Sequence, residues 1–344
     1  GTVPTPLLYY ATHRIDEPEF PGTQSSIGTG IMVTGSHNPP EYNGLKMMIG
    51  GTTLAEEAIQ RLRERVVRKN LPDGMGTYRK TKIINDYVCA VRDDIRLSRP
   101  LKVVVDCGNG VAGLVAPDLF TMLGCNVVPL YSDVDGNFPN HHPDPADPAN
   151  LLDLISAVDE QRADLGIAFD GDGDRLGIVS NCGTIIWPDR MLMLLAQDIL
   201  SRNRGAEIIF DVKCSSRLAS LITDLGGKAL MWKTGHSHIK AKLKETGALL
   251  GGEFSGHICF VERWFGFDDA LYSAARLLEL LSAETRTVED IFLDFPPVIS
   301  TPEIKIPTTE RGKFDVIDAL SRCHYFDEGE IATIDGIRVD YEDG

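Results

Sequence analysis

Three short apolar runs, each opened by a glycine and followed by a polar loop that also contains glycine, constrain the fold of this chain most. The runs are Gly30–Thr34, Gly166–Asp170 and Gly247–Gly251. Their length, composition and bounding glycines indicate buried strands. A second repeat relates Val103–Asp106 to Ile208–Asp211, each followed by a helix-like segment, a Gly-rich break and another strand. We therefore expect tandem related α/β domains with mixed sheets, each sending one loop into a shared central cleft.

Between these runs the chain alternates helix-like and strand-like segments. We expect a buried strand over Leu101–Asp106, an amphipathic helix over Ala55–Lys69 and a later helix capped by Asp268. The Pro-rich segment Phe138–Pro148 cannot form regular structure and predicts a long ordered loop. Phe295–Pro302 has the composition of a linker between domains.

The composition argues against several classes of protein. A chain of 344 residues with 43% hydrophobic residues is expected to form two or three soluble domains. Its formal net charge of −16 disfavours nucleic acids and anionic membranes as partners, and no apolar run is long enough for a transmembrane helix. The seven cysteines are scattered without a Cys-x-x-Cys pair, which favours reduced thiols in the cytoplasm.

The loop from Asp170 to Arg175, Asp-Gly-Asp-Gly-Asp-Arg, carries the sharpest chemical signal. In extended backbone its three carboxylates point to one side, and the glycines let the loop curl around an ion. Two unit charges about 4 Å apart cost roughly 4 kcal/mol at an effective dielectric of 20, so the cluster needs a cation. Oxygen ligands favour Mg²⁺ or Ca²⁺ over zinc, and an EF-hand fails because Arg175 replaces its glycine. A solvated acidic turn is the alternative.

The loop Thr34-Gly-Ser-His-Asn-Pro-Pro presents Ser36 at the end of a strand. Serine is a weak nucleophile unless it is activated or itself carries the group to be transferred. The Gly-x-Ser-x-Gly elbow of serine hydrolases is absent, and His37 is expected to point to the opposite face. Alone, this loop is equally compatible with a tight turn. Beside a magnesium loop it favours a phosphoserine whose charge the metal shares.

The third loop, Gly252-Glu-Phe-Ser-Gly-His, places Glu253 and Ser255 on one face, where they suit the hydroxyls of a sugar. A plain turn at a strand end is the alternative. An acidic protein that handles an anionic substrate needs local positive charge. The candidates are cationic residues that we expect after the same strand ends: Lys46, Arg175, Lys213, Lys233 and His236.

One motif points to another class of enzyme. Gly108-Asn-Gly-Val-Ala-Gly113 matches the Gly-x-Gly-x-x-Gly of dinucleotide-binding proteins, with Asp133 at the end of the next strand. An NAD-dependent dehydrogenase is the alternative that this motif supports, but it leaves the aspartate and serine loops unused. We expect these glycines to permit close packing instead. His141 and His142 are adjacent and are expected to serve the loop rather than chelate a metal.

Four motifs together resemble the α-D-phosphohexomutases: TGSHNPPEYNGLK at 34–46, DGDGDR at 170–175, KTGHS at 233–237 and GEFSGH at 252–257. Their order and spacing match along the whole chain and look like the bacterial phosphomannomutase/phosphoglucomutase branch. Phosphoglucosamine mutases are similar but usually carry TASHNP and GEQSGH, from which Gly35 and Phe254 depart. They are the alternative within the family.

The resemblance implies a heart-shaped α/β protein with four domains around a central cleft. It implies that Ser36 is the phosphoserine, and that Asp170, Asp172 and Asp174 bind Mg²⁺ together with the serine phosphate. The remaining residues are implied by role: His37, Lys46, Arg175 and His257 in catalysis, and Lys213, Lys233, Gly235, His236, Glu253, Ser255 and Gly256 in substrate binding.

The same resemblance sets the expected domains. Residues 1–80 would be the remainder of the phosphoserine domain, 81–184 the metal-binding domain, 185–296 the sugar-binding domain and 297–344 the start of a phosphate-binding domain. Family members continue beyond both ends, so we expect a chain truncated at both. Loss of the C-terminal phosphate clamp is expected to impair its turnover.

The implied activity interconverts hexose 1-phosphates and hexose 6-phosphates of mannose, glucose or both. Phospho-Ser36 would donate its phosphoryl group to the sugar, with a hexose 1,6-bisphosphate as intermediate and activator. Phosphorylated hexoses are the expected partners of a cytoplasmic monomer or weak oligomer. A phosphosugar hydrolase and a non-catalytic binding module are the remaining alternatives.

Overall fold

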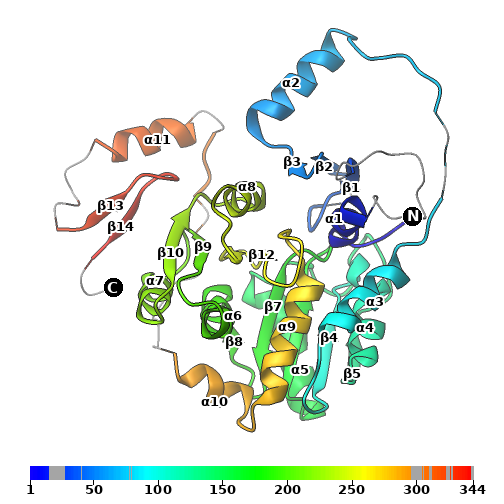
Figure 1. Cartoon of the computed structure of the whole chain (residues 1–344), viewed down its shortest axis with the longest axis vertical. Helices are drawn as coiled ribbons and strands as arrows, with labels where there is room; N and C mark the ends of the chain where they lie inside the picture. Colours follow the sequence, from blue (N-terminus) through cyan, green and yellow to red (C-terminus); the bar gives the residue numbers. More distant parts are fainter. Residues whose placement is uncertain are drawn as a thin grey trace.

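The chain folds into successive α/β units, of which the second and third have mixed sheets, as the repeated strands predict (Figure 1). The computed structural model describes residues 1–14, 28–39, 41–76, 78, 80–295, 304, 306–309, 312–322, 326 and 328–341. Among these residues every helix is too short or too polar to span a bilayer. Six cysteines lie in the described part of the chain; all six are free, and four of them are buried.

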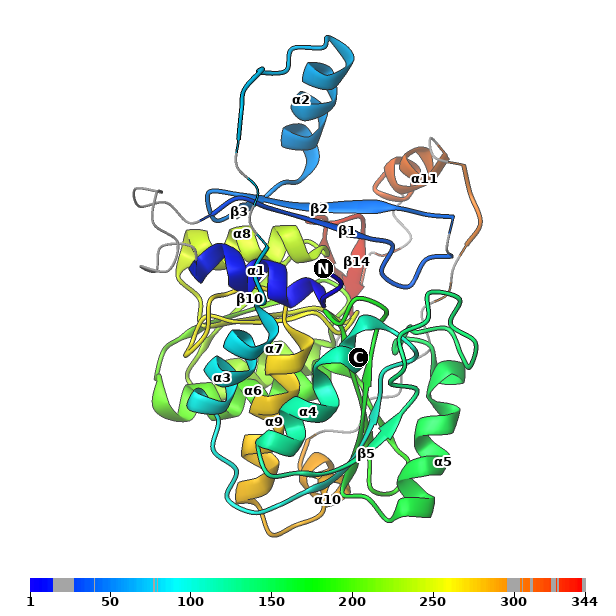
Figure 2. The same ribbon diagram turned by 90° about the vertical axis from the view of Figure 1, so that its right-hand side faces the viewer.

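The first unit is a small antiparallel sheet with two helices. Its elements are α1 (Thr5–Arg14), β1 (Gly30–Thr34), β2 (Gly44–Ile49), β3 (Thr52–Thr53) and α2 (Glu56–Val67), with the strands in the order β1-β2-β3. Figure 2 shows this sheet over α1 and α8 (His236–Thr246), while α2 stands away from the rest. The helix expected over Ala55–Lys69 therefore forms, but none of its residues is buried.

The second unit is a five-stranded sheet in the order β5-β4-β6-β7-β8. Its elements are α3 (Ile84–Asp94), β4 (Lys102–Asp106), the 3₁₀ helix η1 (Val111–Leu114), α4 (Ala116–Met122), β5 (Asn126–Leu130), η2 (Pro148–Leu151), α5 (Leu152–Gln161), β6 (Leu165–Phe169), β7 (Leu176–Ser180) and β8 (Ile185–Ile186). β4 carries apolar side chains to both faces, because Val103 and Val105 join one buried cluster and Val104 joins another. The segment between β5 and η2 forms no helix or strand, as its prolines predict.

The third unit repeats this arrangement in a four-stranded sheet of order β10-β9-β11-β12. Its elements are α6 (Pro188–Arg202), β9 (Glu207–Asp211), α7 (Ser216–Asp224), β10 (Lys228–Trp232), α8, β11 (Leu250–Gly252), β12 (Ile258–Phe260), α9 (Ala270–Ala283) and α10 (Val288–Leu293). In both sheets a central strand has a parallel neighbour on each side, and the next strand runs antiparallel. The shared topology confirms the tandem related domains.

Helix α9 joins the second and third units, because it contacts both β7 and β12 (Figure 1). Asp269 caps it by accepting a hydrogen bond from the backbone N–H of Tyr272 at 3.0 Å, so the expected cap at Asp268 is wrong by one residue. Asp268 is fully buried and its carboxylate lies 2.5 Å from Nζ of Lys240. The carboxylate of Asp268 thus pairs with α8 and not with the start of α9.

A small C-terminal unit holds α11 (Gly312–Leu320) and a hairpin of β13 (Glu330–Ala332) and β14 (Arg338–Asp340). Arg338 ties this hairpin to the third unit, since its guanidinium donates to the carbonyls of Val212 at 2.8 Å and Cys214 at 2.6 Å. Of the linker expected over 295–302, only Phe295 lies within the described residues.

Candidate active site

Ser36 lies in the turn after β1 and has a left-handed backbone with φ of 50°. Such a conformation costs a non-glycine residue about 1 kcal/mol or more, so its surroundings must hold it in place. The hydroxyl of Thr34 accepts a hydrogen bond from the Ser36 N–H at 2.8 Å. Ser36 Oγ then donates to Asp170 Oδ2 at 2.7 Å. The strained turn thus aims the serine hydroxyl at the aspartate loop.

The aspartate loop follows β6 and brings its three carboxylates together. Their oxygens lie within 4.8 Å of one another, and Asp170, Asp172 and Asp174 are 0%, 4% and 0% exposed. The extended backbone assumed from the sequence is wrong, because Gly173 has φ of +75° and its N–H donates to the Asp170 carbonyl at 3.1 Å. The carboxylates converge because this turn folds the loop on itself.

Close backbone contacts hold the serine and aspartate loops together. A Cβ at Gly171 would lie 2.2 Å from the Ser36 carbonyl oxygen, so only glycine permits this approach. On its other side the Gly171 carbonyl accepts a hydrogen bond from the Val111 N–H at 3.1 Å, and a Cβ at Gly110 would lie 2.8 Å from the same oxygen. The glycines of the dinucleotide-like motif therefore serve close packing against the aspartate loop.

Lys46 and two threonines surround the carboxylate of Asp172. Lys46 Nζ lies 2.9 Å from Asp172 Oδ2 and also contacts Asp174 Oδ2. Asp172 Oδ2 further accepts hydrogen bonds from Thr5 Oγ1 at 2.7 Å and Thr34 Oγ1 at 3.0 Å. Lys46 was expected after a strand end, which is wrong, since it lies within β2 opposite Met32. Thr5 belongs to α1, where no sequence pattern marks it.

The electrostatics of the aspartate loop fit a divalent cation. Burial and the neighbouring Asp174 and Asp172 raise the pKa of Asp170 well above its usual value. Burial also disfavours ionised Asp174, but Lys46 and His257 hold the pKa of that carboxyl well below its usual value. Asp172 Oδ1 is buried without a hydrogen-bond donor among the described residues. Crowded, underpaired carboxylate oxygens are suitable ligands for a hard cation such as Mg²⁺.

The loop after β11 meets the aspartate loop through His257. Nδ1 of His257 lies 3.0 Å from Glu253 Oε2 and 2.9 Å from Ser255 Oγ, while Nε2 lies 3.3 Å from Asp174 Oδ1. Burial lowers the pKa of His257, but Asp174 and Glu253 outweigh it and raise that pKa to about 10. His257 Nε2 also lies 3.4 Å from Arg175 Nε.

Gly256 fixes the contact between these two loops. It has φ of +96°, and a Cβ there would lie 2.8 Å from the Leu176 carbonyl oxygen. Its own carbonyl accepts a hydrogen bond from the Leu176 N–H at 3.1 Å. The loop after β11 is thereby seated on the first residue of β7.

The other predicted substrate contacts lie at the same edge of the third sheet. Lys213 follows β9 and Lys233 follows β10. Gly235 has φ of +124°, and its N–H donates to Glu253 Oε1. His236 begins α8 and stacks on His257 with ring centroids 5.4 Å apart.

The side chain of His37 meets Asp144, with Nδ1 3.3 Å from Asp144 Oδ2. Asp144 belongs to the Pro-rich loop and is a neighbour of the site that the motifs did not reveal. Asp268 is another: its Oδ2 lies 3.4 Å from His236 Nδ1. Both contacts join residues far apart in sequence, so only the fold reveals them.

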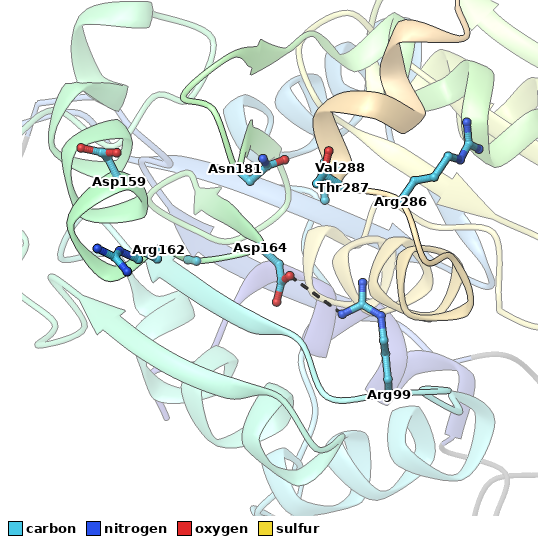
Figure 3. A pocket seen from close by; sticks show the side chains of 9 residues that line it. Arg99, Asp159, Arg162, Asp164, Asn181, Arg286, Thr287 and Val288 are labelled. Atoms are coloured by element: carbon cyan, nitrogen blue, oxygen red, sulfur yellow. Dashed lines mark ion pairs between the residues drawn. The ribbon is translucent and has the colours of Figure 1, made fainter.

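A separate hollow of about 320 Å³ lies away from this cluster, between the second unit and the start of α10 (Figure 3). It holds Arg99, Arg162 and Arg286, and a dashed line in the figure joins Arg99 to Asp164, 3.9 Å away. Arg286 pairs with Glu284 and Asp294. None of the predicted site residues lines this hollow.

Comparisons with known proteins agree with the geometry. Family models described as phosphoglucomutase/phosphomannomutase α/β/α domains I, II and III match residues 1–72, 85–183 and 187–298. Domain II includes the glycines that suggested a dehydrogenase, so that alternative is overturned.

Relatives and a solved structure cover the whole chain. A phosphomannomutase/phosphoglucomutase of Pseudomonas aeruginosa is 58% identical over 344 residues, which are 100% of this chain and 72% of the relative. A phosphoglucomutase of Neisseria meningitidis is 51% identical over 348 residues, covering 100% and 73%. The crystal structure of a phosphoglucomutase/phosphomannomutase family protein from Burkholderia thailandensis matches with a TM-score of 0.93 at 49% identity, over 99% of this chain and 73% of that one. This chain is therefore a member of the α-D-phosphohexomutase family.

Proposed function

We propose that this protein interconverts hexose 1-phosphates and hexose 6-phosphates of glucose, mannose or both through a phosphorylated Ser36. One observation carries the proposal: Ser36 Oγ lies 2.7 Å from Asp170 Oδ2 at the edge of three buried, converging carboxylates. A serine in that position can share the charge of a phosphoryl group with a cation. The names of the relatives support the same activity.

The cofactor that fits these residues is Mg²⁺. Asp170, Asp172 and Asp174 would hold it together with the phosphate on Ser36, since all these ligands are oxygens. When bound, it would neutralise negative charge on the transferring phosphoryl group and on the leaving serine oxygen.

The residues of the protein then divide the work of transfer. The bond between Ser36 Oγ and phosphorus breaks while a bond forms from phosphorus to O6 or O1 of the sugar. The proton of the attacking hydroxyl passes to a base. Lys46 and Arg175 flank the aspartates and supply positive charge beside the moving group. The Glu253 carboxylate accepts hydrogen bonds from sugar hydroxyls, and the Ser255 hydroxyl can donate or accept them.

The product of the first transfer is a hexose 1,6-bisphosphate. For one serine to serve both positions, this intermediate must turn over within the site, so that the other phosphate returns to Ser36. Lys213, Lys233 and His236 lie at the edge where a remote phosphate would be held. The domain division at residues 80, 184 and 296, the monomeric or weakly oligomeric state and the cytoplasmic location stay predictions.

Two alternatives lead to different products. A phosphoglucosamine mutase would prefer the amino sugar, but Gly35 and Phe254 depart from its usual motifs. A phosphosugar hydrolase would release inorganic phosphate. A coupled assay of glucose 1-phosphate, mannose 1-phosphate and glucosamine 1-phosphate, with phosphate release measured in parallel, separates these activities.

The decisive variant for the assay is Ser36→Ala in the full-length protein. It is expected to abolish turnover with little change in thermal unfolding, because the side chain is small and half-buried. Ser216→Ala, an exposed serine in α7, is the matched control and should keep full activity. Full activity of Ser36→Ala would overturn the proposed function.

A further inference from the structure

The Pro-rich loop over residues 138–148 reaches the serine turn, although no motif assigns it a role. Asp144 Oδ2 lies 3.3 Å from His37 Nδ1, and the rings of His37 and His142 are 5.5 Å apart. The other oxygen, Asp144 Oδ1, lies 4.0 Å from Arg175 Nη1. One carboxylate therefore meets the side chain that follows Ser36 and the side chain that follows Asp174.

This loop is anchored where it leaves the sheet. His141 Nε2 lies 2.9 Å from Oδ2 of Asp106, the last residue of β4, which is 1% exposed. Asp106 Oδ1 accepts a hydrogen bond from the Gly108 N–H at 2.9 Å, and Asn140 donates to Asn109 Oδ1 at 2.7 Å. Side chains of the Pro-rich loop are thus hydrogen-bonded to the end of β4 and to the Gly108–Gly113 turn.

The contacts join four loops in a closed ring: the Pro-rich loop, the Gly108–Gly113 turn, the aspartate loop and the serine turn. The Gly108–Gly113 turn binds the aspartate loop through the hydrogen bond from Val111 to Gly171. Gly171 of the aspartate loop packs directly on the Ser36 carbonyl. His37, the next residue of the serine turn, contacts Asp144 of the Pro-rich loop. Within the Pro-rich loop the side chain of Asp144 is 14% exposed and accepts a hydrogen bond from the Ala146 N–H at 3.2 Å. Asp144 is therefore held at a fixed position beside the serine turn.

We propose that Asp144 is a positioning residue for phosphoryl transfer, which holds His37 and Arg175 in place around Ser36. The inference rests on the proposed function of Ser36. Arg175 Nε lies 3.9 Å from Asp170 Oδ2, the oxygen that accepts the serine hydrogen bond. Asp144 shares the guanidinium with Asp170 and so limits how closely Arg175 approaches the serine acceptor. It also holds Nδ1 of His37 beside the Pro-rich loop, 3.3 Å from Asp144 Oδ2.

The variant that tests this is Asp144→Asn in the full-length protein. Asparagine keeps the shape and the acceptor for Ala146, but it removes the negative charge shared by His37 and Arg175. We expect kcat to fall about tenfold or more, as happens when partners of site residues are lost. KM and the thermal unfolding midpoint should change little, because substrate contacts and backbone anchors remain. Asp147→Asn is the matched control, since it removes the same charge from the same loop, while the Asp147 side chain accepts a hydrogen bond from the Ala149 N–H at 3.0 Å.

A double-variant cycle separates positioning from a general effect on folding. If Asp144 acts through His37, the loss in the pair Asp144→Asn and His37→Gln is smaller than the product of the two single losses. Losses that simply multiply, or a kcat of Asp144→Asn equal to that of Asp147→Asn, would overturn the inference.

Crystal structures of the variants give a readout that does not depend on turnover. In Asp144→Asn the His37 ring and the Arg175 guanidinium should leave their positions, whereas in Asp147→Asn they should not. Unmoved side chains in Asp144→Asn would overturn the inference even in an active enzyme. Absence of mutase turnover in the unaltered protein would instead overturn the proposed function, and the structures would still decide the role of Asp144.

Discussion

The second and third units share one sheet topology, yet the loops at corresponding strand ends differ in charge. The loop after β6 holds three carboxylates, and burial together with its neighbours raises the pKa of Asp170. The loop after β11 holds Glu253. Burial favours a higher pKa for this carboxyl, but its hydrogen bond with His257 outweighs burial and lowers the pKa. The first loop holds three carboxylates and one cationic side chain, Arg175, whereas the second pairs its one carboxylate with His257.

This difference explains how one scaffold supplies two functions. A buried cluster with more carboxylates than cationic side chains of its own is stabilised by a bound cation, so the second unit is suited to hold a metal ion. A paired carboxylate needs no ion, and each of its oxygens can accept a further hydrogen bond from a hydroxyl. The chemistry of each unit is therefore set by a few loop residues, while the sheet only places them.

The largest effect should follow from neutralising a carboxylate of the aspartate loop. Asp170→Asn removes a metal ligand and the acceptor of Ser36, so we expect turnover to fall about a thousandfold or more. Without added Mg²⁺ the variant should unfold at a higher temperature than the unaltered protein, because one repelling charge is gone. Chelator should then have less effect on its unfolding midpoint. Asp159→Asn, on α5, is the control. Turnover and thermal unfolding are measured together, and a fully active Asp170→Asn enzyme would break the comparison.

A smaller effect should follow from altering the loop after β11. Glu253→Gln removes the negative charge that pairs with His257 and one oxygen that would accept a hydrogen bond from a sugar hydroxyl. We therefore expect kcat/KM to fall about a hundredfold. The Mg²⁺ concentration for half-maximal activity should remain as in the unaltered protein, because Glu253 is outside the aspartate cluster. A large shift in that concentration would show that the two loops do not divide the work as described.

The smallest effect should follow from altering the contact between Gly256, in the loop after β11, and Leu176 at the start of β7. Gly256→Ala brings a Cβ to 2.8 Å from the Leu176 carbonyl oxygen at a positive φ, and should cost about 2 kcal/mol or more of unfolding free energy. Gly247→Ala is the control, because it also has a positive φ but meets nothing within 4 Å. It should cost about 1 kcal/mol. Urea unfolding measures both, and equal costs would show that the contact with Leu176 is unimportant.

The sequence predicts the strands and loop positions well, because apolar runs bounded by glycine leave few other structures. The three loops do lie at strand ends, and the carboxylates of the aspartate loop do converge. The cause was misjudged, since a turn at Gly173 and not extended backbone brings them together. Periodicity likewise predicts helix α2 but not its exposure, which depends on what packs against it.

The tertiary contacts of single residues could not be predicted from the sequence. Thr5 lies 167 positions from Asp172 and is joined to it by one hydrogen bond. Asp144 meets His37 through a loop whose prolines reveal only that it is irregular. Neither belongs to a pattern of hydrophobic period or motif spacing. Asp268 was placed one residue wrongly as a helix cap because the sequence does not show its ion pair with Lys240.

The central claim is that the transferred phosphoryl group resides on Ser36. Protein carrying radioactive phosphate on Ser36, mixed with unlabelled glucose 1-phosphate and quenched within one turnover, tests it directly. We predict that the label leaves the protein at least as fast as steady-state turnover and appears first in hexose bisphosphate and then in hexose 6-phosphate. Label that stays on Ser36 while turnover proceeds at its full rate would contradict the claim.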